Sequence, residues 1–306
     1  MNTRQLRYVI KVAEERSFSI AAKKLYIAQP SLSQFISKVE KEVGYELFDR
    51  MATPLKLTAA GEVYVKTAQE ILNLEYAMEK RLRDMGKAQY GKLAVGVSPY
   101  NGLMPLALKQ FFDAFPNCKV DIQDSVGTAE RLRLLEKGKI DLCVQPVSDT
   151  LSSKFVVDEI MMDDLLLVVP SEYPINRELT CRNAGEALYP MIDLSALLMF
   201  HDVPFVMVSD EKYLRKSVNV LFEQVEIEPR IQMVCHKSEG CLAMAAAGIG
   251  ATIVQLSLIK YRDPQPQMKY YVIRQDCVRN KIAAVYVRNR YISKAARAFI
   301  NILKTF

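Results

Sequence analysis

Apolar residues in the first 58 positions recur with the three-to-four-residue period of short α-helices. Three such apolar faces follow one another. Pro30 can open the third helix, because the first helical turn needs no N–H at that position, and Gly44 can end it. Residues 47–50 and 53–58 then predict a short β-hairpin. The faces comprise Leu6, Tyr8, Val9, Val12 and Ala13; Phe18, Ile20, Ala21, Ala22 and Leu25; and Leu32, Phe35, Ile36, Val39 and Val43.

One long helix is predicted from Ala59 to about Lys87, which would reach about 42 Å. Its apolar stripe is interrupted once, at Glu75, and is suited to packing against a partner helix. The alternative is a helix that packs on its own domain. The stripe consists of Tyr64, Ala68, Ile71, Met78, Leu82 and Met85.

Beyond Gly91 the pattern changes to strands alternating with helices, which is typical of an α/β fold. We expect two lobes: residues 91–161 with 267–306 form the first, and residues 162–266 form the second. The proline-rich stretch 263–266 is interpreted as a connection between them. Strands are expected at 92–97, 119–124, 140–144, 165–169, 205–208, 230–234, 251–254, 269–273 and 282–287, and helices at 104–115, 128–137, 212–224, 239–247 and 294–304.

Charge is concentrated at the N-terminus. Residues 1–58 hold ten Lys and Arg against six Asp and Glu, whereas the remaining 248 residues hold 31 against 29. A basic head on a nearly neutral body favours a polyanion as the partner of the head. No run of about 18 or more apolar residues occurs, and the first residues lack a secretory pattern, so we expect a cytoplasmic protein with no membrane partner.

The second and third helices have the character of a helix-turn-helix. Ala21 and Ala22 are small enough for two helices to cross closely, and short polar side chains stand where the next helix would enter the major groove of double-stranded DNA. We expect Gln34 and Ser31 to contact bases, and Arg50 and Lys56 in the hairpin to contact phosphates. The alternative is a polar helix that faces solvent. The predicted DNA-binding residues are Gln29, Pro30, Ser31, Ser33, Gln34, Ser37, Lys38, Arg50 and Lys56.

A further set of residues recurs at a characteristic spacing along the first 61 positions. They are Leu6-Arg7-Tyr8, Ser17-Phe18, Ala21-Ala22, Leu25, Gln29-Pro30-Ser31-Leu32-Ser33, Ile36, Glu40, Gly44, Leu47-Phe48-Asp49-Arg50 and Leu57-Thr58-Ala59-Ala60-Gly61. In this combination and spacing the region resembles the LysR-type transcriptional regulators. A looser similarity to the same family continues through Pro105, Phe111, Pro116, 138–142 and 247–250.

The resemblance implies a winged helix-turn-helix domain at 1–58, a dimerising linker helix at 59–90, and an effector-binding domain at 91–306. The last would be two Rossmann-like lobes resembling periplasmic binding proteins. Members of the family are usually homotetramers, and a small effector between the lobes changes how they bend DNA. Two departures stand out. Ala28 replaces a residue that could cap the recognition helix, and residues 181–204 are long and apolar for their place in the second lobe.

Effector contacts are expected beyond the carboxyl ends of the strands, where open α/β sheets bind ligands. Backbone N–H groups and hydroxyls there would suit a small anion, with a carboxylate as the candidate. For Ser98 and Thr128 the alternative role is helix capping. The expected contacts are Ser98, Tyr100, Thr128, Gln145 and, from the family resemblance, Phe205 on a second-lobe strand.

Enzyme chemistry finds little support. His201 and His236 lack flanking carboxylate patterns, and the cysteines show no metal-binding spacing, so we expect no catalytic residues, metal or cofactor. Reduced, half-buried thiols are favoured over a redox sensor. A transport solute-binding protein and a deaminase- or transferase-type enzyme would share the two-lobed fold. The first 58 residues argue against the former, and the lack of a nucleophile motif argues against the latter.

Overall fold

The structure is a computed structural model that describes residues 2–85, 91–98, 103–124, 127–147, 151–181, 188–210, 213–261, 263–278 and 280–306. The chain forms two compact units, Met1–Ala88 and Gln89–Phe306. Within the described ranges, no helix has both the length and the apolar character needed to cross a membrane.

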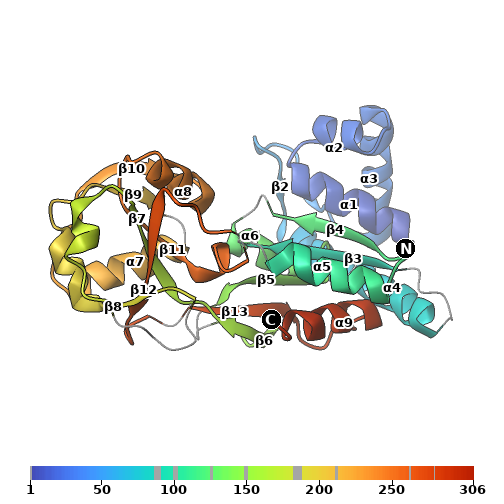
Figure 1. Cartoon of the computed structure of the whole chain (residues 1–306). Helices are drawn as coiled ribbons and strands as arrows, with labels where there is room; N and C mark the ends of the chain where they lie inside the picture. Colours follow the sequence, from blue (N-terminus) through green and yellow to red (C-terminus); the bar gives the residue numbers. More distant parts are fainter. Residues whose placement is uncertain are drawn as a thin grey trace. The chain divides into compact units, whose positions relative to one another are not determined.

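The first unit is a three-helix core followed by a hairpin and a long helix, as the apolar pattern predicted (Figure 1). Its core joins α1, α2 and α3 through fully buried side chains such as Val9, Ala21 and Leu32. Gly44 ends α3 in the left-handed conformation, with φ of 80°. The elements are α1 (Thr3–Glu15), α2 (Phe18–Lys24), α3 (Gln29–Val43), β1 (Phe48–Asp49), β2 (Lys56–Leu57) and α4 (Ala59–Met85).

The apolar stripe of α4 packs on its own unit in its first part and is exposed in its second part. Near its start, Ala68 and Ile71 pack on Leu6 and Ile10 of α1, so this part packs on its own unit. Glu75, the residue that interrupts the stripe, forms an ion pair of 3.2 Å with Arg7 of α1. From Leu74 onward the apolar side chains of the helix are exposed: Leu74 by 72 %, Met78 by 55 %, Leu82 by 60 % and Met85 by 83 %.

The first lobe of the second unit is a five-stranded sheet with the order β4-β3-β5-β13-β6. Strands β3, β4 and β5 run parallel, and β13 runs antiparallel to both its neighbours. Helices α5 and α9 bury their apolar faces on one side, and α6 covers the other. The elements are β3 (Lys92–Val97), α5 (Leu103–Ala114), β4 (Lys119–Gln123), α6 (Thr128–Glu136), β5 (Leu142–Val147), β6 (Phe155–Met162), β13 (Lys281–Val287) and α9 (Lys294–Leu303).

The second lobe contains the sheet β11-β7-β12-β8 and the parallel pair β10-β9, which are joined by a bridge between Phe205 and Ala251. Apolar side chains of α7 and of a 3-10 helix pack on one side, and those of α8 on the other. The elements are β7 (Leu165–Pro170), β8 (Met191–Asp193), the 3-10 helix η2 (Leu194–Phe200), β9 (Phe205–Val208), α7 (Tyr213–Gln224), β10 (Ile231–Cys235), α8 (Ser238–Ala246), β11 (Thr252–Gln255) and β12 (Met268–Arg274).

The expected return to the first lobe near Gln267 is wrong. β12 pairs with β7 and β8 and so belongs to the second lobe; the chain returns only between Arg274 and Lys281, to form β13 (red among green strands in Figure 1). The prolines at 264 and 266 therefore mark a turn before β12 rather than a lobe connection.

The two crossings between lobes touch each other. The Asp163 N–H donates to the Asn280 carbonyl at 2.8 Å. The buried Asp163 carboxylate accepts from the N–H and hydroxyl of Ser257 at 2.8 and 2.6 Å. Burial raises the pKa of this carboxyl to about 6. The two segments that connect the lobes are therefore held side by side.

Candidate functional site

The start of α3 presents an uncapped, polar surface. Ala28 makes no side-chain cap hydrogen bond, as the sequence predicted, and Pro30 has no N–H to satisfy. The side chains of Gln29, Ser31 and Gln34 are exposed, and so is that of Lys38 one turn further on. This face of the helix is free to meet a partner.

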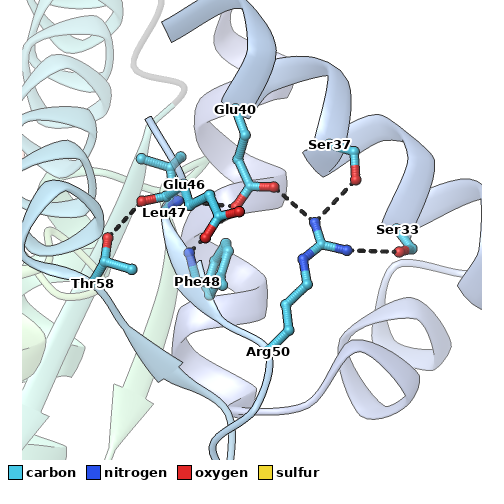
Figure 2. Close-up of polar contacts among 8 residues, drawn as sticks. All are labelled: Ser33, Ser37, Glu40, Glu46, Leu47, Phe48, Arg50 and Thr58. Carbon is cyan, nitrogen blue, oxygen red and sulfur yellow. Dashed lines mark hydrogen bonds and ion pairs between the residues drawn. The ribbon is translucent and has the colours of Figure 1, made fainter. Parts of the chain in front are cut away.

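Arg50, which follows β1, folds back along α3 (Figure 2). Its guanidinium donates to the Ser37 hydroxyl at 3.0 Å and to the Ser33 hydroxyl at 3.5 Å, and it pairs with the Glu40 carboxylate at 2.7 Å. It also lies 5.4 Å from the ring centre of Phe18. Three residues that the sequence analysis treated as separate DNA contacts thus form one network in the free protein.

The second oxygen of Glu40 holds the start of the hairpin. It accepts from the backbone N–H groups of Leu47 and Phe48 at 2.9 and 3.3 Å. Glu40 is only 8 % exposed, so this carboxylate is buried together with its partners. Sequence analysis assigned Glu40 no role, although its place one turn after Ser37 could have indicated it.

The same short segment anchors the long helix α4. The Thr58 N–H donates to the Leu47 carbonyl at 3.0 Å, and the Thr58 hydroxyl donates to the Glu46 carbonyl at 2.6 Å (Figure 2). A Cβ added to Gly61 would lie 2.0 Å from the Leu47 carbonyl oxygen, so only glycine permits this approach. Recognition helix, hairpin and α4 therefore meet at Leu47.

In the first lobe, three of the predicted effector residues are brought close together by a residue that sequence analysis missed. Arg131 of α6 is 1 % exposed. It donates to the Gln145 side-chain oxygen at 2.9 Å, to the Thr128 hydroxyl at 3.1 Å and to the Val97 carbonyl at 3.4 Å. Ser98 follows Val97 and donates its N–H to the Val144 carbonyl at 2.9 Å. Gly127, rather than Thr128, is the N-cap of α6.

The arrangement places positive charge and an unused donor at the ends of β3 and β5. Because the guanidinium is removed from water, burial lowers the pKa of Arg131 from its usual value. Gln145 is fully buried, and its side-chain Nε2 has no hydrogen-bond partner in the described structure. Gly96 makes room for Arg131, because an added Cβ would lie 3.0 Å from its Cδ. A buried side-chain amide without a hydrogen-bond partner, such as that of Gln145, reduces the stability of the folded state.

Phe205, the effector contact expected in the second lobe, lies at the start of β9. Its ring is fully buried in the core of that lobe, between Phe200 and Phe222. At the other end, Arg215 donates to the Val208 carbonyl at 3.0 Å, much as Arg131 does in the first lobe. Tyr100 lies outside the described residues.

A hydrogen bond joins the carboxyl end of the first-lobe sheet to the second lobe. The Tyr213 hydroxyl, at the start of α7, donates to the Val147 carbonyl at the end of β5, at 3.4 Å. The carboxyl end of the first-lobe sheet therefore faces the second lobe.

The buried thiols are poor nucleophiles. Burial raises the pKa values of Cys143 and Cys241 to about 12 and also raises that of Cys118. Across the described ranges, no group of three or more His, Cys, Asp or Glu could hold a metal ion.

A basic helix-turn-helix unit followed by a two-lobed α/β unit defines a DNA-binding regulator with a ligand-binding domain. Residues 3–62 match the model of the bacterial regulatory helix-turn-helix protein, lysR family, and residues 87–306 match the LysR substrate binding domain. The chain belongs to the LysR family of transcriptional regulators, which are not enzymes.

Relatives and solved structures agree with this assignment. The chain is 28 % identical to the HTH-type transcriptional regulator BsdA of Bacillus subtilis (strain 168), over 99 % of this chain and 100 % of that protein. A full-length OxyR variant from Pseudomonas aeruginosa matches with a TM-score of 0.71 and 21 % identity, over 99 % of this chain and 95 % of that one. Full-length CbnR complexed with its target DNA matches with a TM-score of 0.61 and 23 % identity, over 100 % and 99 %. The last two show the shared fold.

Replacement of Glu40 by Ala tests the junction between α3 and the hairpin. The change leaves the Leu47 and Phe48 amides and Arg50 without their buried acceptor, so local stability should fall by about 3 kcal/mol. Hydrogen exchange of the Leu47 and Phe48 amides measures this directly. Glu46→Ala is the control, because the junction uses only the backbone of the exposed Glu46. Unchanged exchange in Glu40→Ala would contradict the assignment.

Proposed function

We propose that this LysR-family regulator binds DNA sequence-specifically through α3 and the hairpin, and that a small effector held between its two lobes modulates this activity. The observation that carries the DNA-binding part is the exposed polar start of α3, next to a hairpin fixed to the same helix by Glu40 and Arg50. A helix so presented can enter the major groove while the hairpin follows the phosphate backbone.

Within this surface the roles differ by residue. Gln34 and Ser31 are exposed near the start of α3 and can hydrogen-bond base edges. Lys56 is exposed on β2 and can neutralise a phosphate. Arg50 is already paired in the free protein, so its contact with phosphate would be made while it also holds Ser33 and Ser37 in place.

Two substitutions separate base from phosphate contacts. Gln34→Ala should cost about 1–3 kcal/mol of binding and relax the preference at one base position. Lys56→Ala should weaken binding to all sequences alike and lower the salt dependence by about one counterion. Selection from a random duplex pool, together with salt titrations, measures both. A Gln34→Ala variant with the wild-type base preference would refute the role of Gln34.

Oligomerisation is proposed through the second half of α4. Leu74, Met78, Leu82 and Met85 are spaced by four, four and three residues, and all are more than half exposed. An extended helix does not keep such a stripe in water without a partner helix. A dimer formed here, paired again into a tetramer, is the assembly that we propose.

The double substitution Met78→Asp and Leu82→Asp should abolish self-association through α4. Buried carboxylates opposite apolar side chains are strongly unfavourable, so sedimentation should show smaller species with weaker DNA binding. The control removes the exposed Glu79–Arg83 ion pair from the same helix by two Ala substitutions. Wild-type protein that is monomeric at micromolar concentration would eliminate this proposal.

The effector site is proposed at the strand ends around Arg131. The guanidinium supplies positive charge, and the unpaired Gln145 Nε2 supplies a donor. Ser98 directly follows β3, and Thr128 is the first residue of α6, the helix that carries Arg131. These groups suit a small carboxylate. The Tyr213–Val147 hydrogen bond, which brings the second lobe to the end of β5, supports a ligand that contacts both lobes. A ligand that contacts both lobes favours one closure angle.

Gln145→Glu tests this site while preserving the fold. The new carboxylate still accepts from Arg131, but it replaces the free donor with a negative charge, so affinity for a carboxylate should fall by more than about tenfold. Thermal-shift screening of small mono- and dicarboxylates identifies a ligand, and titration of both proteins compares them. Gln224→Glu makes the same change of charge on the exposed end of α7. Equal affinity of Gln145→Glu and wild type would place the site elsewhere.

A further inference from the structure

Tyr26, in the turn between α2 and α3, is 95 % exposed. Its backbone adopts the left-handed conformation, with φ of 56°. That conformation disfavours side chains with a bulky Cβ substituent and is better suited to Gly or Asn. An aromatic residue here therefore has neither a packing role nor a conformational advantage.

The turn holds Tyr26 in a fixed direction. Its N–H donates to the Lys23 carbonyl at 3.2 Å, and the next N–H, of Ile27, donates to the Ala22 carbonyl at 3.1 Å. Ile27 in turn packs against the core of the unit. The backbone is thus hydrogen-bonded on both sides of Tyr26, and the side chain extends into solvent.

The surroundings indicate an anionic partner. Lys23 is exposed in the last turn of α2, and α3 begins with Gln29, only three residues after Tyr26. Tyrosine hydroxyls are among the groups that bind phosphate oxygens and fix a protein's register on a duplex. The turn leads directly into the proposed DNA-reading helix, and Lys23 provides positive charge complementary to the phosphate backbone of DNA.

We propose that the Tyr26 hydroxyl donates a hydrogen bond to a phosphodiester oxygen of bound DNA, beside the groove that α3 enters. Tyr26 is then a positioning residue: it fixes α3 on the backbone and reads no base. The inference rests on the proposed mode of DNA binding. It also accounts for a tyrosine at a position where folding alone favours Asn or Gly.

Two variants of the full-length protein separate binding from folding. Tyr26→Phe keeps the ring and removes the hydroxyl, so affinity should fall by about tenfold. Tyr26→Asn relieves the backbone, so its unfolding midpoint should rise by about 2–4 °C while its affinity falls to a similar extent. Tyr45→Phe is the control, because Tyr45 is a 67 % exposed tyrosine beyond the other end of α3.

The probes are a duplex enriched by the wild-type protein from a random pool and an unselected duplex of equal length. A phosphate contact should weaken binding of Tyr26→Phe to both duplexes, leave its base preference unchanged and leave Tyr45→Phe at wild-type affinity. Wild-type affinity of Tyr26→Phe overturns the proposal. A changed base preference, or loss only in Tyr26→Asn, also overturns it, because the contact would then be to a base or through the ring. If the wild type enriches no sequence, sequence specificity fails, and the unselected duplex still tests Tyr26.

Discussion

The DNA-binding unit depends on one buried carboxylate. Glu40 accepts from the first two amides of the hairpin, and it pairs with Arg50 after β1, so α3 and the hairpin cannot move independently without leaving polar groups unpaired. The Leu47 carbonyl then receives the N–H of Thr58, directly before α4. This junction therefore fixes the relative positions of α3, the hairpin and α4, which carry the proposed base contacts, phosphate contacts and dimer contacts.

The second unit uses a related device at the ends of its strands. Arg131 and Arg215 each donate to the last carbonyl of a parallel strand, Val97 or Val208. Buried guanidinium groups thus satisfy backbone acceptors where an open α/β sheet exposes them, and they leave positive charge where ligands bind such sheets. The two crossings between the lobes are tied together by Asp163 and Asn280. In the proposed mechanism, an effector would favour one arrangement of the lobes about this connection.

The sequence alone predicted those features that depend on residues close together in the chain. Periodicity located the three short helices, the long helix and most strands, and Gly44 and Ala28 behaved as their side chains require. The hydrophobic pattern failed for strands whose place in a sheet is fixed by pairing with strands distant in the sequence. β6 was missed, and β12 was assigned to the first lobe, because the strand neighbours that fix their places are far away in sequence. Arg131 was overlooked because only the folded chain brings it to Gln145, and the stripe of α4 gave no sign that α1 covers half of it.

We infer that Glu40 makes the recognition helix and the hairpin act as one DNA-reading surface. A double-mutant cycle of Glu40→Gln and Lys56→Ala, measured as affinity for the selected duplex, tests it most directly. If Glu40 positions the hairpin, Lys56→Ala should cost at least about 0.5 kcal/mol less in the Glu40→Gln background than in wild type. Additive losses would show that the hairpin reaches the phosphates without Glu40, and would contradict the account.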